Sequence, residues 1–195
     1  MGSRTHHQQY NTMKKITLIA LSLITLLSAC DKKEEKEARR LAQFEQIGGV
    51  NLSDENNELW GRLGQPDVNY KDVAFDLTAY PVPAMDKQNL LLVNKSDKDR
   101  TYQLKIVNAY FKGAPSNFPE SQWARQVGFA GKTINIENLA GNAEEVVFAK
   151  DISVAAKAYG VIDLDVSQFK QGFYRIIIEV EGERKYWDNL WVFRK

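Results

Sequence analysis

The sequence predicts a mainly β protein: an antiparallel β-sandwich of about seven strands, with one short helical insertion and a charged tether in front of it. Two observations predict this fold class. From Val73 onward, apolar residues recur at every second position, which is typical of half-buried strands. Polar and glycine-containing turns separate these stretches, as expected for strands that fold back on one another.

Seven stretches show the strand pattern. In Val73–Thr78 and Tyr102–Val107, apolar side chains alternate with mostly polar ones. Leu90–Val93 is a continuous apolar run, which predicts a central strand covered on both faces. The polar run 94–100 predicts a turn that joins this strand to the next one as a hairpin. The other strands are expected at Val146–Phe148, Ile162–Val166, Tyr174–Val180 and in a last stretch ending Leu190–Phe193.

The chain carries an export signal before these strands. Lys14 and Lys15 precede the apolar run Ile16–Leu27, in the order of the charged and apolar regions of a secretory signal peptide. As a helix, this run spans roughly 18 Å, well short of the roughly 30 Å needed to cross a bilayer. We therefore expect residues 13–29 to be a signal peptide. Residues 1–12 precede the lysines and are expected to be an upstream extension or added residues.

The signal ends in Leu27-Ser28-Ala29-Cys30. This tetrad resembles the lipobox of bacterial lipoproteins at all four positions. The resemblance implies cleavage after Ala29 and a lipidated Cys30, which carries a thioether-linked diacylglycerol (palmitate-type chains) and an acylated amine. Several acyl chains give stable anchoring, because each buried methylene contributes about 0.8 kcal/mol. The expected location is the bacterial cell envelope, on a membrane facing the periplasm, with the inner and outer membranes as alternatives.

Removal of residues 1–29 changes the chemistry of the chain. Both histidines, His6 and His7, are lost, and the lone Cys30 is used by the lipid. Lys and Arg fall from 26 to 23 while Asp and Glu stay at 25, so the net charge is near −2. That balance argues against binding of nucleic acid. Without histidine, Ser-His-Asp, Cys-His and imidazole metal sites are excluded, and we expect no catalytic residue, metal or cofactor.

Residues 30–66 are expected to connect the lipid to the sandwich domain, which the sequence places at 67–195. Asp31–Arg40 alternates in charge and predicts a solvated tether. Apolar spacing predicts one short helix through Leu41–Ile47, which ends at Gly48-Gly49. A second helix is expected from Ser53 as N-cap to Gly64, followed by Pro66, as a cap over the domain or a docking segment.

The stretch Leu164–Val180 resembles the penultimate strand of immunoglobulin-like domains, in which a glycine-containing loop precedes a tyrosine and an alternating strand. The resemblance implies a tyrosine corner, with the Tyr174 hydroxyl bonded to the preceding loop and Gly172 freeing the backbone. The run NKSDKDRTYQLKI also resembles the strand-turn-strand of bacterial Ig-like modules. The sandwich is therefore expected to be Ig-like, which supports a fold and not a function.

Residues 111–129 interrupt the strand rhythm. Gly113, Pro115 and Pro119 exclude a central strand, and Pro119 can begin a short helix. This insertion carries the candidate partner-binding residues Phe118, Trp123 and Arg125, since exposed aromatic and arginine side chains dominate interface energies. The alternative is that its aromatic side chains close one end of the core.

The last strand carries Trp187, Trp191 and Phe193 on one face. Such a stripe predicts either core packing or a platform on which sugars stack. Trp187 and Trp191 are therefore the candidate glycan-stacking residues.

Three functions follow as hypotheses. The first is a lipid-anchored, non-enzymatic binding or assembly module that holds another envelope protein, and it predicts an exposed apolar patch, around Trp123 or on an edge strand. The second is a lipoprotein that binds glycan or peptidoglycan. The third is a hydrolase that uses only carboxylates, for which Asp163 with Asp165 and Asp97 with Asp99 are the available pairs. Solvated charges are the favoured interpretation of both pairs, and the first function is the favoured one.

Overall fold

The computed structural model describes residues 45–66, 74–112 and 145–194, together with Lys36, Arg39, Arg125 and Gly128. Within these ranges, the side chains of residues 183–187 lie outside the description. The chain divides into two units, Met1–Ala42 and Gln43–Lys195. The strands from Glu45 to Val192 all belong to the second unit.

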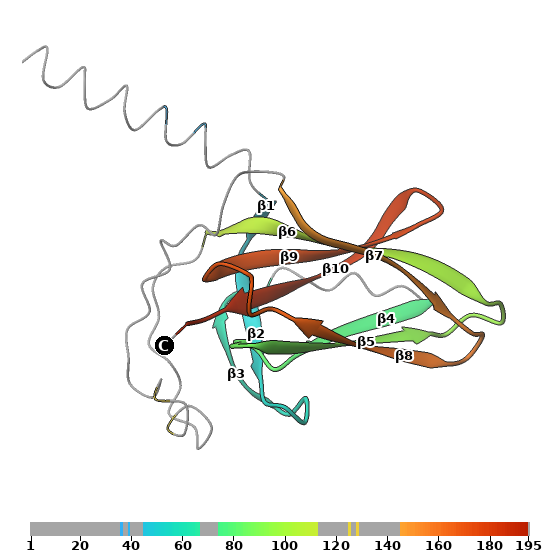
Figure 1. The fold of residues 1–195 in the computed structure, drawn as a ribbon, viewed down its shortest axis with the longest axis horizontal. Helices are drawn as coiled ribbons and strands as arrows, with labels where there is room; N and C mark the ends of the chain where they lie inside the picture. The colour runs from blue at the N-terminus through green and yellow to red at the C-terminus, as the bar shows by residue number, and fades with distance from the viewer. Residues whose placement is uncertain are drawn as a thin grey trace, which may run out of the picture. The chain divides into compact units, whose positions relative to one another are not determined.

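Seven strands form the two layers seen in Figure 1. One sheet has the order β4 (Phe75–Tyr80), β5 (Lys87–Asn94), β8 (Tyr159–Asp165). The other has β9 (Gly172–Val180) between β6 (Arg100–Phe111) and β10 (Glu183–Val192), and β7 (Val146–Val154) pairs with the opposite edge of β6. All these pairs are antiparallel. The expected mainly β sandwich is therefore confirmed, with a strand at each of the seven stretches.

Three more strands precede this sandwich. β1 (Glu45–Ile47) runs parallel to the end of β6, beyond the residues of β6 that pair with β7. β2 (Gly49–Ser53) and β3 (Leu59–Gly64) form an antiparallel hairpin. The short helices expected over 41–47 and 53–64 are therefore wrong wherever the structure describes these residues. The compact unit also begins at Gln43, ahead of the domain boundary that the sequence suggested at residue 67.

The hairpin replaces the expected second helix because tertiary burial overrides local spacing. Val50, Leu52 and Leu63 are almost completely buried against the sheet. In β2 the buried residues Val50 and Leu52 flank the exposed Asn51, which is the alternation of a strand. The residues Leu59, Trp60 and Leu63 fit a helical period, but that period did not determine the fold.

The expected hairpin between 90–93 and 102–107 is also wrong. β5 and β6 belong to different sheets, so the polar segment 95–99 crosses from one layer to the other. Asn94 fixes the crossing, because its side-chain amide donates to the carbonyl oxygens of Lys98 (2.9 Å), Val154 (3.0 Å) and Ala155 (3.0 Å). A buried amide with several acceptors stabilises this connection.

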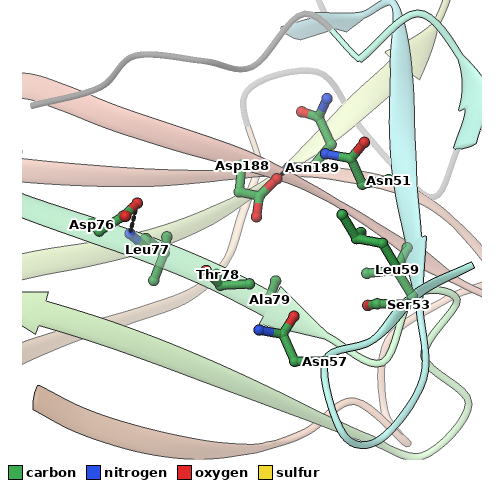
Figure 2. Close-up of a pocket in the computed structure, with 11 residues that line it drawn as sticks. Asn51, Ser53, Asn57, Leu59, Asp76, Leu77, Thr78, Ala79, Asp188 and Asn189 are labelled. Carbon is green, nitrogen blue, oxygen red and sulfur yellow. Dashed lines mark hydrogen bonds between the residues drawn. The ribbon is translucent and has the colours of Figure 1, made fainter.

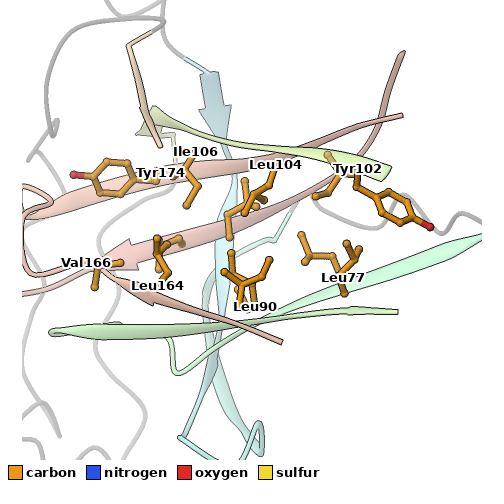
Figure 3. Close-up of a cluster of buried hydrophobic side chains, with 14 of the residues drawn as sticks. Leu77, Leu90, Tyr102, Leu104, Ile106, Leu164, Val166 and Tyr174 are labelled. Atoms are coloured by element: carbon orange, nitrogen blue, oxygen red, sulfur yellow. The ribbon is translucent and has the colours of Figure 1, made fainter. Parts of the chain in front are cut away.

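The main core lies between the two sheets, as Figure 3 shows. Period-two alternation brings one face of each strand into it. The residues labelled in that view, all almost completely buried, are Leu77, Leu90, Tyr102, Leu104, Ile106, Leu164, Val166 and Tyr174.

A second cluster lies on the opposite face of the β6-β9-β10 sheet. There the β2-β3 hairpin covers an aromatic row in which Phe173 stacks on Phe111 (centroids 4.9 Å apart) and on Trp191 (5.6 Å). Polar contacts hold the first strands in place. Asn189 donates from Nδ2 to the Gly49 carbonyl at 2.7 Å, and the Arg175 guanidinium donates to the Gln46 carbonyl.

The hydrogen bond of a tyrosine corner is present. The Tyr174 hydroxyl donates to the Lys170 carbonyl oxygen at 2.6 Å, across the loop before β9. Gly172, inside that interval, has φ of 152°, a conformation that side chains rarely adopt. Burial raises the pKa of the Tyr174 hydroxyl to about 12, so it remains a donor over the whole physiological range.

Candidate functional site

Some of the functional residues predicted from the sequence lie within the described part of the chain, and others do not. Ala29, Cys30, Phe118 and Trp123 lie outside the described residues. Arg125 is described, and its side chain is exposed. A partner-binding surface formed by Phe118, Trp123 and Arg125 therefore stays a prediction.

The glycan-stacking prediction is wrong for Trp191. Its side chain is only 3% exposed and lies between the rings of Phe173 and Phe193, 5.6 and 5.7 Å away. It is a core residue beneath the β2-β3 hairpin and cannot present a flat face to a sugar. Trp187 pairs with Ile177 through its backbone, and its side chain lies outside the described part of the chain.

Exposed apolar side chains gather instead on the outer face of the three-stranded sheet. The register places Val93 opposite Tyr159, and Leu91 opposite Val161. Tyr159 is 71% exposed and Val161 is 51% exposed, while Leu91 and Val93 are half-buried. We call these four residues the outer patch. β8 pairs only with β5 among the described strands, so the patch reaches an edge of its sheet.

Two acids of β8, Asp163 and Asp165, lie on the same face as the outer patch. Asp163 follows Val161 on the same face of β8, is exposed, and forms no ion pair or hydrogen bond with the described residues. Asp165 lies two residues further along β8, and its negative charge is stabilised by neighbouring groups. Hydrogen bonds from the Ser167 side chain and backbone hold the pKa of its carboxyl below the usual range, with help from Lys87 and Arg194.

The second feature is a cavity of about 300 Å³ along the edge of the sandwich where β4 and β10 come together. Figure 2 shows the residues that line it, which come from β2, the β2-β3 loop, β3, β4, the segment after β4 and β10. Its polar lining residues are Asn51, Ser53, Asn57, Asp76, Thr78, Asp188 and Asn189, and its apolar ones are Leu59, Leu77, Ala79 and Val82.

Local backbone contacts hold the walls of this cavity. Ser53 and Val82 form an isolated bridge with two hydrogen bonds, at 3.0 and 3.1 Å, which closes β2 onto the segment after β4. In the β2-β3 loop, Asp54 Oδ1 accepts from the backbone N–H groups of Asn56 and Glu58, both at 2.9 Å. This turn presents Asn57, which has a left-handed φ of 64°, at the cavity.

Asp188 is the acid of this cavity whose pKa is shifted by its surroundings. It pairs with Ile176 and therefore lies on the core-facing side of β10, where its carboxylate accepts from the N–H groups of Asn189 (2.7 Å) and Ala79. Burial raises the pKa of the Asp188 carboxyl to about 6, and nearby Asp76 adds to the rise. Backbone hydrogen bonds and Arg175 oppose it.

The sequence offered two acid pairs as candidates for catalysis, and the structure shows what each pair contacts. Asp99 accepts from the Ala156 N–H at 2.9 Å, and Asp97 lies 3.0 Å from Lys157 Nζ, so both acids tie the 95–99 segment to the β7-β8 turn. Asp163 and Asp165 share the exposed face of β8, as expected. The acids that do line one cavity are Asp76 and Asp188, a pair that the sequence analysis did not identify.

Among the described residues, no three Asp, Glu, His or Cys side chains are grouped so that they could hold a metal ion. No helix in this part of the chain is long and apolar enough to cross a membrane.

Comparison with known proteins gives little. No protein-family model matches the chain, and no curated protein matches it. Among solved structures it is similar to a β-D-glucoside glucohydrolase from Trichoderma reesei, with 12% identity and a TM-score of 0.25 over 67% of this chain. The match spans 20% of that enzyme's chain, and a likeness at this level carries no argument about function.

Both features of the site had a signal in the sequence. The apolar run Leu90–Val93 places two large residues on each face of β5, so its outward pair needed a cover that the described residues do not supply. Counting back by two from Val192 and Leu190 places Asp188 on the core face. What the sequence could not supply is the β2-β3 hairpin, which completes the cavity around that carboxyl group.

Proposed function

We propose that the protein is a lipid-anchored lipoprotein of the bacterial cell envelope, whose β-sandwich binds another envelope protein through the outer patch. The observation that carries this proposal is the row of apolar side chains Leu91, Val93, Tyr159 and Val161 on one open sheet face. Contiguous exposed apolar surface beside a sheet edge is typical of protein-protein interfaces.

The composition of β5 supports an interface at this face. A strand with a continuous apolar run is normally covered on both sides. In β5 the core takes Leu90 and Leu92, while Leu91 and Val93 on the other side are only half-buried. A partner that covers the outer patch would bury Leu91 and Val93, so that both faces of this apolar run would be covered.

The charge pattern indicates what such a partner carries. Asp163 lies next to the apolar row, exposed and without a described cation. We therefore expect the partner to present apolar side chains to Tyr159 and Val161, and a basic residue to Asp163. Asp163 also disfavours pairing of β8 with a second copy centred on Ile162, because Asp163 would then lie opposite Val161 of the other copy.

The lipid at Cys30 supplies the other half of the proposed function. It would hold the sandwich at a membrane surface, and the solvated tether from Asp31 would let the domain reach a neighbouring protein. Confinement to a surface raises the effective concentration of both partners, so a patch of this modest size would suffice.

The test is chemical crosslinking in intact cells followed by purification of the tagged chain. The chain is compared with Val161→Ser, with the matched variant Val146→Ser, and with Cys30→Ala. Val146 is 50% exposed on β7 of the other sheet, so it matches Val161 in size and exposure. One defined envelope protein should be recovered with the unaltered chain and with Val146→Ser, and about tenfold less with Val161→Ser. Equal recovery from both serine variants would contradict the proposal.

A further inference from the structure

The cavity between β4 and β10 has the chemistry of a cation site. Its lining includes the carboxylates of Asp76 and Asp188, and none of the residues that line it is Lys, Arg or His. Hydroxyl and amide groups of Ser53, Thr78 and Asn51 add further hydrogen-bond acceptors. Figure 2 shows Asp188 and Asn51 facing the same space from different strands.

Of the two acids, Asp188 is the one available to a ligand. Asp76 already lies 3.2 Å from Lys95 Nζ and accepts from the Leu77 N–H at 3.0 Å. Asp188 accepts two backbone N–H groups, but no Lys or Arg in the described part of the chain forms an ion pair with it. Asp188 is half-buried and Arg175 only partly offsets the cost of its burial, so a bound cation would stabilise its ionised form.

The size and lining of the cavity indicate what kind of cation fits. About 300 Å³ is at the lower end of the range of small-molecule sites, roughly 300–1,000 Å³. A hard metal ion would need about six oxygen ligands, and no group of three acidic or other metal-binding side chains occurs among the described residues. Leu59, 71% exposed, Leu77 and Val82 provide an apolar wall for a short carbon chain.

We propose that the β4-β10 cavity binds a primary ammonium group carried on a short aliphatic chain, with Asp188 as its counter-ion. The ammonium group donates its three hydrogens to the Asp188 carboxylate and to neighbouring side-chain oxygens. The carbon chain lies along Leu77 and Val82 toward the exposed Leu59. The same chemistry is offered by a free alkylamine and by a lysine side chain. This proposal uses residues other than the outer patch and does not depend on the proposed function.

The burial of Asp188 and the charges around it make ligand binding at this carboxyl group pH-dependent. Asp76 on β4 repels the ionised form, and Arg175 on β9 favours it. With the pKa of the Asp188 carboxyl at about 6, the group is mostly protonated at pH 5 and mostly ionised at pH 7.5. Since the ammonium group binds the ionised form, its affinity should rise about tenfold between these two pH values.

The experiment is an NMR titration of the full chain in detergent. The probes are n-butylammonium, Nα-acetyl-lysine-N-methylamide and the uncharged n-butanol. Both ammonium probes should shift amide signals of residues 51–53, 76–79 and 188–189, and n-butanol should not. A stronger response to n-butylammonium assigns the site to free amines, and a stronger response to the lysine derivative assigns it to protein lysines.

Two comparisons complete the test. Asp188→Asn should weaken binding of n-butylammonium at least tenfold at pH 7.5, while Asp163→Asn, which changes an exposed acid outside the cavity, should leave it unchanged. The pH dependence of the unaltered chain provides the same test without a variant. Equal binding at pH 5 and pH 7.5, equal binding of n-butanol, or signal changes confined to residues outside the cavity would overturn the proposal.

Discussion

Asp188 places an ionisable carboxyl group on the core-facing side of β10, next to Ile176 and the edge of β4. The unfolded chain loses this proton near pH 4, whereas burial keeps it bound in the folded chain up to about pH 6. Between these values the folded state binds more protons than the unfolded state. The contribution of Asp188 to stability is therefore full below pH 4 and is lost as the pH rises through 6.

Replacing Asp188 by Asn removes this titration. We expect Asp188→Asn to raise the free energy of unfolding at pH 7.5 by about 1–3 kcal/mol, because a partly buried charge is eliminated while an acceptor for the Ala79 N–H is kept. Urea denaturation of both chains at pH 4, 5, 6 and 7.5 measures the difference. The gain should shrink toward zero at pH 4, and a gain that is the same at all four pH values would refute the assignment.

Tyr174 provides a second test at a single residue. Tyr174→Phe removes the hydroxyl that donates to the Lys170 carbonyl at 2.6 Å and leaves that carbonyl without this donor. We expect a loss of about 1–2 kcal/mol in the free energy of unfolding. Tyr159→Phe is the control, since that side chain is 71% exposed, and it should change stability by less than about 0.5 kcal/mol. Similar losses in both variants would show that the corner hydrogen bond contributes nothing.

Among the elements, the β2-β3 hairpin depends on backbones that approach closely. Gly64 has φ of 67°, and a Cβ there would lie 2.3 Å from the Gly48 carbonyl oxygen. Gly182, in the β9-β10 turn, has φ of 80° but nothing within 4 Å of its Cβ position. An alanine at either position would have to adopt a left-handed backbone conformation, which costs about 1–2 kcal/mol. Only at Gly64 would its Cβ also clash with neighbouring backbone.

Comparing Gly64→Ala with Gly182→Ala isolates that clash. Gly64→Ala should lose at least about 2 kcal/mol more stability than Gly182→Ala, because backbone must move to relieve the overlap. Thermal unfolding of the two variants side by side gives the difference. Equal losses would mean that β2 and β3 are not packed as described.

The elements also show where sequence patterns were sufficient. Period-two alternation, together with the continuous apolar run Leu90–Val93, located the seven sandwich strands, because half-buried strands show their inner and outer faces directly in the sequence. The same pattern could not tell which sheet a strand joins, so the polar segment 95–99 was taken for a hairpin although it crosses between layers. In residues 53–64 the apolar residues recur at helical spacing. The chain forms the β2-β3 hairpin there instead, because Leu52 in β2 and Leu63 in β3 are buried against the sheet.

The candidate site was less predictable than the fold. Leu91 and Val93 belong to an apolar run, and a run alone does not reveal which face stays uncovered. Trp191 illustrates the reverse case, because an aromatic residue in an edge strand became core once the hairpin covered it. Both outcomes depend on contacts between segments far apart in the chain, which no local pattern contains.

For the whole molecule, attachment to a membrane is expected to depend on one residue. Cys30→Ala should move the chain from the membrane fraction to the soluble fraction and abolish incorporation of a labelled fatty acid, because only the thiol can form the thioether. Asp31→Asn is the matched control, since it leaves the lipobox intact. Membrane association of the Cys30→Ala chain equal to that of the control would contradict lipid anchoring.

The most direct test of the proposed function is site-specific photocrosslinking in intact cells. A photoreactive amino acid is placed at residue 161 in the outer patch or at residue 146 on β7, two positions of nearly equal exposure (51% and 50%). A crosslink from residue 161 to one envelope protein, absent from residue 146 and from a 161-labelled chain that also carries Tyr159→Ser, is the predicted result. Crosslinks of equal yield from both positions, or from neither, would contradict a binding surface on this sheet.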